Sequence, residues 1–395
     1  MAKVKDIAMQ IRGVSYHPED LHDNLDEDSV VLLRANNIKD GKLILDDVVY
    51  VSKSKVAEQQ YLQTGDILIC ASSGSKELVG KAAFVDSVKN PMTFGAFCKV
   101  VRPQPEYSEY LGHYFNSPVY RRKISALSAG ANINNIKNEH IDNLDIQLVD
   151  EKERRGIITI LNELNMLISL RKQQLFKLDE LVKARFVEMF GDPINNPMKW
   201  IVSKIEDIAA QEKNALKAGP FGSALKKEFY VKSGYKIYGQ EQVICGDASF
   251  GDYYIDEEKY KELKNYAVQA GDILISLVGT YGKTLIMPDN YEAGIINPRL
   301  MKITLNKNKV TPIYFKYYFE SDALKASMDA NTHGGTMGIL NLGIIRQMKI
   351  QVPPLSIQNQ FATFVERVAQ QKQTVQQSLE KLELMKKALM QEYFG

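Results

Sequence analysis

The six residues GDILIC (Gly65–Cys70) recur almost unchanged as GDILIS (Gly271–Ser276), 206 positions further along the chain. Six residues alone can match by chance, so their meaning depends on whether neighbouring stretches repeat as well. Four more pairs recur in the same order with offsets of 201, 204, 204 and 204: KDIA and EDIA, YLGHYFNS and YFKYYFES, LDIQLV and MKIQVP, and EMFG and EYFG. Five ordered matches at nearly one spacing indicate two diverged copies of a single unit.

Each copy has two parts. Residues 1–150 and 192–354 contain short β-rich runs that alternate with loops rich in Gly and Asn, which predicts a mixed α/β domain in each copy. Residues 151–191 and 355–395 are rich in Leu, Glu, Lys, Gln and Arg and have no Pro or Gly in their helical interior beyond the first turns, which predicts one long helix in each. The segment GDPINNP (191–197) ends the first helix and serves as the linker to the second copy.

The two predicted helices carry apolar residues at alternating spacings of three and four, the pattern of a coiled-coil seam. Charged residues interrupt the seam at different places in the two helices, which favours pairing of the helices with each other. The alternative is that each helix packs only on its own mixed domain. A helix of this length spans roughly 55–60 Å. The seam residues are Leu161, Leu164, Ile168, Leu175, Leu178, Val182, Val365, Val368, Val375, Leu379, Leu382 and Leu389.

Composition is typical of a globular protein: 45% of the 395 residues are hydrophobic, 25% are charged, and the net charge is +2. No apolar run is long enough to span a membrane, so we expect no membrane contact. The N-terminal sequence lacks the features of a secretory leader. Three widely spaced cysteines cannot form a disulfide framework, and we expect a cytoplasmic location.

Motifs for catalysis are missing from the sequence. LVGTYGKT (277–284) resembles a phosphate-binding loop but has Leu where the first Gly is required. The five histidines form no metal-ligand spacing, and no G-x-S-x-G elbow occurs. The chain also lacks the N/D-P-P-Y/F motif and the Gly-rich S-adenosylmethionine loop of an amino-methyltransferase. We therefore expect a binding protein without a catalytic site, metal or cofactor of its own.

The loops of both copies place polar and basic residues beside glycine, which lets a backbone approach a partner closely. Amides can pair with adenine, Arg and Lys with guanine, and Ser, Thr and Lys with phosphates. The alternative is that these loops are polar because water surrounds them. The candidate DNA-binding residues are Arg12, Tyr16, Arg34, Asn36, Asn37, Ser72, Ser73, Lys76, Lys81, Asn132, Asn134, Asn135, Lys137, Lys217, Phe221, Ser223, Lys226, Lys227, Gln240, Gln242, Thr280, Tyr281, Lys283, Arg299, His333, Thr336 and Asn341.

Among these candidates, Lys81 and Lys283 follow glycine at matching places in the two copies and are predicted to contact the DNA backbone. Gln240, Gln242 and Asn341 are predicted to read bases.

The chain resembles the specificity subunits of type I restriction–modification systems over its whole length. The matching motifs are GPFGS and LKKEFY in copy two, the paired GDILI runs, G-x-L-N before QVPPLSIQNQF, and LDELVKARFVEMFGDP. The resemblance implies two pseudo-symmetric mixed α/β target-recognition domains joined by two long antiparallel coiled-coil helices, an α+β fold. Each domain would read one half of a split double-stranded DNA site. Copy one has RGVSYHPEDL (12–21) in place of GPFGS.

The resemblance also implies a non-catalytic subunit with macromolecular partners. These are two modification subunits, which bind S-adenosylmethionine and methylate adenine, and restriction subunits, which translocate and cleave DNA. Two other functions stay open on the residues alone. One is a coiled-coil scaffold that binds protein and does not read DNA, which the near-neutral charge favours. The other is a methyltransferase with recognition and catalysis in one chain, against which the missing motifs argue.

Overall fold

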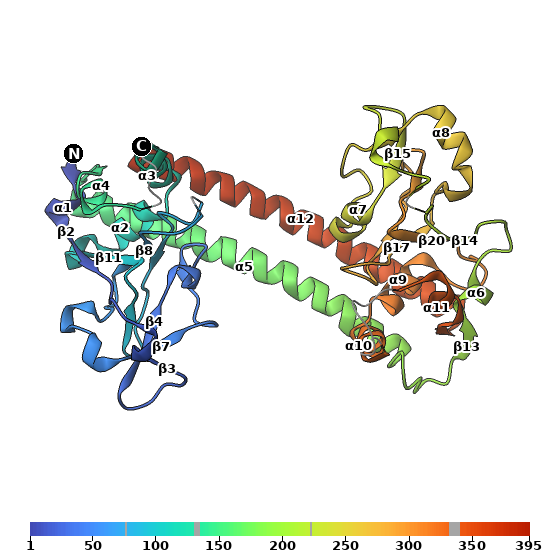
Figure 1. The fold of residues 1–395 in the computed structure, drawn as a ribbon, viewed down its shortest axis with the longest axis horizontal. Helices are drawn as coiled ribbons and strands as arrows, with labels where there is room; N and C mark the ends of the chain where they lie inside the picture. Colours follow the sequence, from blue (N-terminus) through green and yellow to red (C-terminus); the bar gives the residue numbers. More distant parts are fainter. Residues whose placement is uncertain (76, 130–134, 222, 332–339) are drawn as a thin grey trace. The chain divides into compact units, whose positions relative to one another are not determined.

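The computed structural model describes residues 1–75, 77–129, 135–221, 223–331 and 340–395. The chain forms two compact units (Figure 1). Unit 1 comprises Met1–Lys172 and Gln376–Gly395, and unit 2 comprises Gln173–Val375. The two longest helices, α5 (Glu151–Phe190) and α12 (Leu355–Phe394), therefore each contribute residues to both units.

Unit 1 contains two four-stranded sheets. The first is antiparallel, with the order β2-β11-β8-β9, and the second has the order β10-β4-β7-β3 with β10 and β4 parallel. Their bounds are β2 Ala8–Arg12, β11 Cys98–Pro103, β8 Ile67–Cys70, β9 Ala82–Phe84, β10 Met92–Phe94, β4 Ser29–Leu33, β7 Val49–Ser52 and β3 Leu21–His22. Shorter elements are β1 Ala2–Lys3, α1 Val4–Ile7, β5 Ile38–Lys39, β6 Lys42–Leu43, α2 Ser108–Phe115, α3 Pro118–Ala129, α4 Asn138–Asp142 and β12 Asp145–Ile146.

Unit 2 repeats this arrangement. Its antiparallel sheet has the order β14-β20-β17-β18, and a three-stranded sheet has the order β16-β15-β19 with β15 and β19 parallel. Their bounds are β14 Leu216–Ala218, β20 Leu300–Ile303, β17 Ile273–Ser276, β18 Thr284–Ile286, β16 Tyr254–Ile255, β15 Tyr235–Tyr238 and β19 Gly294–Ile296. The remaining elements are β13 Ile201–Lys204, α6 Ile205–Ile208, α7 Gln240–Cys245, α8 Glu257–Glu262, α9 Pro312–Phe319, α10 Asp322–Asn331, α11 Leu342–Gln347 and β21 Lys349–Val352.

The antiparallel sheets of the two units have the same strand order, and the parallel pair β10 and β4 corresponds to β19 and β15, which confirms the duplication predicted from the sequence. The strand of the repeated GDILI run pairs with the same neighbour in both units: Ile67 lies opposite Val101, and Ile273 lies opposite Ile303. β3, β5 and β6 of unit 1 have no counterpart strands among the described residues of unit 2.

The Gly and the Asp of the repeated GDILI run have structural roles: the Gly forms a turn and the Asp is a buried charge. Gly65 and Gly271 adopt φ values of +94° and +80°, a region that side chains rarely enter. The carboxylates of Asp66 and Asp272 are at most 1% exposed, and each pairs with a cation on the adjacent strand. Arg102 Nε lies 2.8 Å from Asp66, and Lys302 Nζ lies 3.1 Å from Asp272. A buried carboxylate without such a partner would be strongly destabilising.

The core of each unit contains the end of a helix that belongs to the other sequence copy. Phe190 ends the helix of copy one, yet its ring is buried in unit 2, 4.7 Å from the ring of Tyr314. Phe394 ends the helix of copy two and is buried in unit 1, 5.1 Å from the ring of Tyr110. Tyr110 and Tyr314 are equivalent positions, as are Phe190 and Phe394, so the same edge-to-face contact is made twice.

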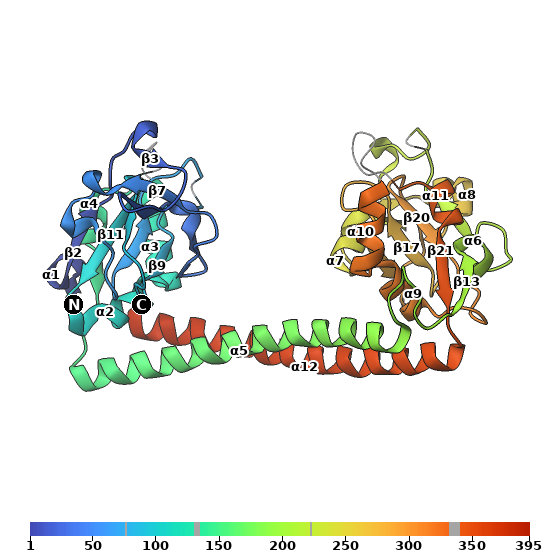
Figure 2. The ribbon, with the colours of Figure 1, turned by 90° about the horizontal axis from the view of Figure 1, so that it is seen from below.

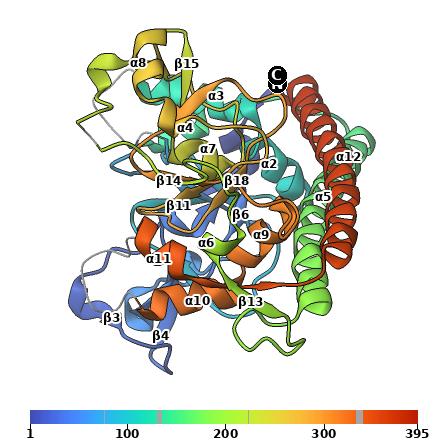
Figure 3. The ribbon, with the colours of Figure 1, turned by 90° about the vertical axis from the view of Figure 1, so that its right-hand side faces the viewer.

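The two long helices also contact each other within each unit, in opposite chain directions (Figures 2 and 3). In unit 1, Lys172 of α5 forms an ion pair with Glu383 of α12 at 2.9 Å. In unit 2, Asp179 of α5 pairs with Lys372 of α12, and the ring of Phe186 meets that of Phe361 edge to face. All twelve predicted seam residues are buried or half-buried. The alternative that each helix packs only on its own mixed domain is therefore wrong.

Neither α5, α12 nor any other helix in the described part of the chain is long and apolar enough to cross a membrane.

The buried helix ends lead to a prediction about stability. Phe190→Ala is expected to lower the free energy of unfolding of unit 2 by about 3–5 kcal/mol, because it removes a ring from a closely packed aromatic core. Phe394→Ala is expected to do the same in unit 1. Denaturant unfolding followed by circular dichroism measures both. The matched control is Phe176→Ala on α5, whose side chain is 64% exposed and whose loss should change stability by less than about 0.5 kcal/mol. Equal effects of the buried and exposed substitutions would contradict the packing described.

Candidate nucleic-acid interface

The ends of several strands of unit 2 meet at one edge, which we name strand-end edge 2 (residues 219–221, 239–240, 277–280, 297–299 and 340–341). Backbone hydrogen bonds tie these segments together. Gly219 N–H donates to Leu300 at 2.8 Å, and Asn297 N–H donates to Tyr238 at 2.8 Å. Leu277 N–H donates to Arg299 at 3.0 Å. The edge is therefore built from loops far apart in sequence.

Gly219 makes the closest approach in this edge. A Cβ atom at this position would lie 1.9 Å from the carbonyl oxygen of Asn297, so no other residue fits without a shift of the backbone. The next residue, Pro220, is buried, and Phe221 follows with its side chain 87% exposed. The G-P-F stretch therefore combines a fixed backbone with a side chain that projects into solvent.

Unit 1 has an equivalent edge, which we name strand-end edge 1 (residues 13–16, 34, 71–72, 95–97 and 135–136). A Cβ atom on Gly13 would lie 2.1 Å from the carbonyl oxygen of Gly95, the same close approach as at Gly219. Ala71 N–H donates to Phe97 at 2.9 Å, and Ile136 N–H donates to Ala71 at 2.7 Å. Both edges therefore rest on the same backbone contacts.

The predicted DNA-binding residues differ in their accessibility. Five lie outside the described residues: Lys76, Asn132, Asn134, His333 and Thr336. Two are buried, Asn37 and Gln242. Seven are half-buried: Tyr16, Arg34, Ser72, Ser73, Lys217, Gln240 and Tyr281. The remaining thirteen are exposed: Arg12, Asn36, Lys81, Asn135, Lys137, Phe221, Ser223, Lys226, Lys227, Thr280, Lys283, Arg299 and Asn341.

The two buried amides hold the backbone of their own units. Gln242 accepts a hydrogen bond from Gly239 N–H at 2.7 Å and donates to the carbonyl of Phe250 at 2.6 Å. Asn37 accepts from Arg34 N–H at 2.8 Å and donates to the carbonyls of Ile44 and Asp47. A base contact by either amide would require these bonds to break.

Several accessible candidates are also engaged with their own unit. Gln240 donates to the carbonyl of Val278, and Asn341 caps α11 by accepting from Ile344 N–H at 3.0 Å. Arg34 pairs with Asp47 at 3.2 Å, and the ammonium of Lys217 lies 5.1 Å from the ring centre of Tyr266. These residues shape the loops, and their predicted contacts with DNA remain predictions.

Three basic side chains of unit 2 remain available. Lys227, Lys283 and Arg299 are exposed, and none of them forms an ion pair with another described residue. Arg299 lies within edge 2 itself. Guanidinium and ammonium groups that are free of internal partners can bind phosphates or the acceptor edge of guanine.

Phe97 is an edge residue that the sequence analysis missed. Its carbonyl accepts hydrogen bonds from Ala71 and Ser72 at 2.9 and 3.0 Å, and its side chain is 71% exposed. It occupies in edge 1 the place that Arg299 occupies in edge 2, since each carbonyl accepts from the residue that follows the GDILI strand. Aligning the two copies at an offset of 202 pairs these residues and could have identified the position.

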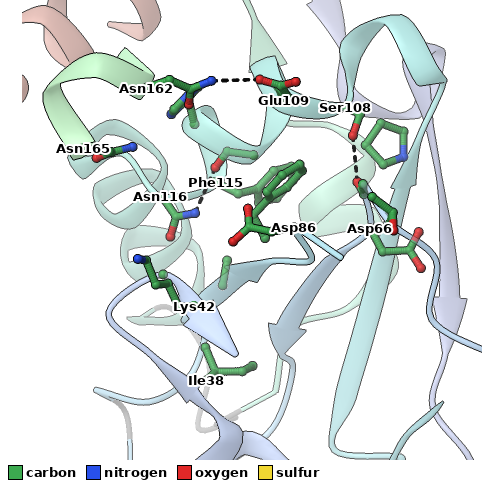
Figure 4. Close-up of a pocket in the computed structure, with 18 of the residues that line it drawn as sticks. Ile38, Lys42, Asp66, Asp86, Ser108, Glu109, Phe115, Asn116, Asn162 and Asn165 are labelled. Carbon is green, nitrogen blue, oxygen red and sulfur yellow. Dashed lines mark hydrogen bonds between the residues drawn. The ribbon is translucent and has the colours of Figure 1, made fainter. Parts of the chain in front are cut away.

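Unit 1 also contains an open cavity of about 1600 Å³ beside α2 and the adjoining parts of α5 and α12 (Figure 4). Its lining includes Gly65, before the start of β8, and none of the residues that define edge 1. Asn162 of α5 donates to Glu109 of α2 at 2.9 Å in its wall. Lys81 lines the cavity as well, and both Lys81 and its counterpart Lys283 in unit 2 are exposed.

The described residues include no metal-binding cluster, and two of the three cysteines, Cys70 and Cys98, are buried. No group of three or more His, Cys, Asp or Glu side chains there could hold a metal ion. Burial raises the pKa of Cys98 to about 12 and also raises the pKa of Cys70. Neither thiol is therefore a thiolate at neutral pH.

Comparison with known proteins shows which family the chain belongs to. A relative from Escherichia coli (strain K12), the type I restriction enzyme EcoKI specificity subunit, is 30% identical over 96% of this chain and 84% of its own length. The chain belongs to the family of type I restriction enzyme specificity subunits. The StySPI specificity subunit of Salmonella potsdam is 27% identical over 96% of this chain and 83% of its own length.

The family model described as the type I restriction modification DNA specificity domain matches residues 197–384, which include all of edge 2. Two solved structures share the fold. One, from work on assembly and conformational transition of the type I R-M system, has a TM-score of 0.62 at 15% identity over 99% of this chain and 96% of its own. The other, the S subunit from M. genitalium, has a TM-score of 0.52 at 13% identity over 100% of this chain and 95% of its own.

His113 on α2 of unit 1 is a buried titratable residue that unit 2 does not have at the equivalent position. Burial lowers its pKa to about 4, while a hydrogen bond with Asn162 and the charge of Glu109 act in the opposite direction. The nearby ammonium of Lys386 lowers it further. The equivalent position in unit 2 is Tyr317, whose pKa burial raises to about 12, so it stays neutral across the acidic range.

This difference predicts a pH dependence of stability in unit 1. The unfolded chain binds a proton at His113 below about pH 6.5 and the folded unit does not until about pH 4, so stability should be lost as the pH falls through this window. At pH 4 the protonation of His113 in the unfolded chain lowers the free energy of unfolding of unit 1 by about 3 kcal/mol. In His113→Phe the free energy of unfolding of unit 1 should decline less between pH 6.5 and 4, as measured by denaturant titrations at each pH. An identical decline in the variant and the parent would show that His113 is not the group responsible.

Proposed function

We propose that this chain is the sequence-specific DNA-binding subunit of a type I restriction–modification complex, and that each unit reads one half of a bipartite, asymmetric site in double-stranded DNA. One observation supports this most strongly. The two strand-end edges have the same backbone contacts, built on Gly13 and Gly219, but carry different exposed side chains. A shared frame with different surface residues is what two readers of two different half-sites require.

The charges around edge 2 fit a nucleic-acid partner. Lys227 and Lys283 would neutralise phosphates, and Arg299 would contact guanine or phosphate. In unit 1, Arg12, Asn135 and Lys137 are exposed near edge 1, and Lys137 forms an ion pair with Glu139. A net charge of +2 does not oppose this role, because binding depends on where basic residues lie and not on their total.

The partners in this proposal are two modification subunits and the restriction subunits. α5 carries seven large hydrophobic side chains that are at least 40% exposed: Ile160, Met166, Leu167, Leu170, Phe176, Leu181 and Val187. So many exposed apolar side chains on one helix are unusual unless a protein partner covers them. We assign these exposed side chains of α5 to contact with modification subunits.

Catalysis belongs to the partners in this proposal. The modification subunits would bind S-adenosylmethionine and methylate adenine, and this chain would position them without a cofactor of its own. The restriction subunits would translocate and cleave the DNA. The complex would act in the cytoplasm, as part of defence against foreign DNA.

Exchange of one recognition segment tests the proposal. Residues 192–354 are replaced by the equivalent segment of a relative with a different target, and the chimera is assembled with its modification subunits. Selection from a random duplex library should then yield a motif altered in one half only. A chimera with residues 1–150 exchanged serves as the matched control and should alter the other half.

Two results would contradict the proposal. A change in both halves from a single exchange would mean that the two units do not read independently. Selection of no sequence at all by the intact complex would instead favour the scaffold function, in which the chain binds proteins but not DNA.

A further inference from the structure

Each strand-end edge presents one exposed phenylalanine, and the two come from different loops. Phe97 of edge 1 is 71% exposed, and Phe221 of edge 2 is 87% exposed. Their equivalents in the opposite unit are polar: Arg299 corresponds to Phe97, and Ser15 corresponds to Phe221. The aromatic side chain is therefore a feature of each edge that the duplication did not copy.

The backbone of Phe97 is held from both sides. Cys98 N–H donates to Gly95 at 2.8 Å, which closes the turn between β10 and β11 around Phe97. The carbonyl of Phe97 also accepts from Ala71 and Ser72, and the following residue, Cys98, is buried. The ring thus projects from a fixed support.

Phe221 has a comparable support. The preceding residue, Pro220, is buried, and the carbonyl of Phe221 accepts from Ala224 N–H at 2.8 Å. Leu225, which follows this turn, is 5% exposed. These contacts hold the backbone beneath each ring in place, and both rings are exposed to a partner.

We propose that Phe97 and Phe221 make the apolar base contacts of this subunit, one in each half-site. This inference rests on the proposed function and adds two specificity-determining residues to it. A ring that projects beside hydrogen-bonding groups can pack against the methyl group of thymine or against a base step that it partly unstacks. Both are contacts with the apolar surface of bases, and neither involves a phosphate.

The salt dependence of DNA binding distinguishes the proposed role of the two rings from that of the basic residues. Loss of a phosphate contact reduces the slope of log affinity against log salt concentration, because fewer counterions are released. Loss of a ring contact should leave that slope unchanged. The discriminating measurement is therefore affinity at several salt concentrations.

The test uses the complex assembled with its modification subunits, bound to a duplex that carries its bipartite site. Phe97→Ala and Phe221→Ala should each weaken binding by at least about tenfold, with the salt slope of the parent. Base substitutions along the site should locate each ring, since the loss from Phe97→Ala should shrink when the base pair it contacts is changed. The positions found for the two residues should fall in opposite halves.

Two further duplexes identify the kind of contact. Deoxyuridine in place of thymine removes the methyl group, and 2-aminopurine reports unstacking by its fluorescence. A response to either probe that disappears in the alanine variant supports the proposal. Matched controls are Met9→Ala in unit 1 and Ile201→Ala in unit 2, which remove exposed apolar side chains outside the edges and should leave affinity unchanged.

The outcomes separate this inference from the proposed function. If the parent complex binds its site and both alanine variants keep its affinity and base preference, the inference is wrong and the function stands. If a variant loses affinity equally on all sequences together with part of the salt slope, its ring does not contact bases and the inference is wrong as well. If the parent complex binds no duplex, the proposed function itself fails.

Discussion

The architecture depends on an aromatic contact made twice. Phe190 closes the core of unit 2 against Tyr314, and Phe394 closes the core of unit 1 against Tyr110. In both cases the phenylalanine belongs to the sequence copy that contributes least to that core. Neither copy can therefore complete its own unit, and a single copy would leave one large apolar ring exposed and one core unfilled. This explains why the repeated EMFG and EYFG sequences stand at the ends of the two long helices.

The duplicated parts and the diverged parts serve different needs. The Asp66 and Asp272 turns, the close glycine contacts at Gly13 and Gly219, and the strand order of the four-stranded antiparallel sheet are the same in both units. They hold the loops in place. The exposed positions on that frame differ, with Phe97 facing solvent where the other unit has Arg299. A frame that tolerates such changes lets the two halves of a target differ from each other, which is what an asymmetric site demands.

The sequence predicted the fold well because its evidence was periodic. Heptads located both long helices, and the five repeated stretches paired equivalent strands or helices of the two units. The individual site residues were harder to predict. Gln242 looked like a base reader, but it is buried and bonded to Gly239 and Phe250, because a glutamine that caps a loop has the same local sequence as one that faces solvent. Phe97 was missed because an exposed ring cannot be distinguished from a buried one by residue type alone.

The direct test of the account is a map of methylated adenines in the DNA of a host that carries this chain with its modification partners, compared with the same host without this chain. The account predicts a methylated motif with two specified parts separated by a fixed number of unspecified bases, present only when the chain is present. A single continuous motif, or the same methylation with and without the chain, would contradict it.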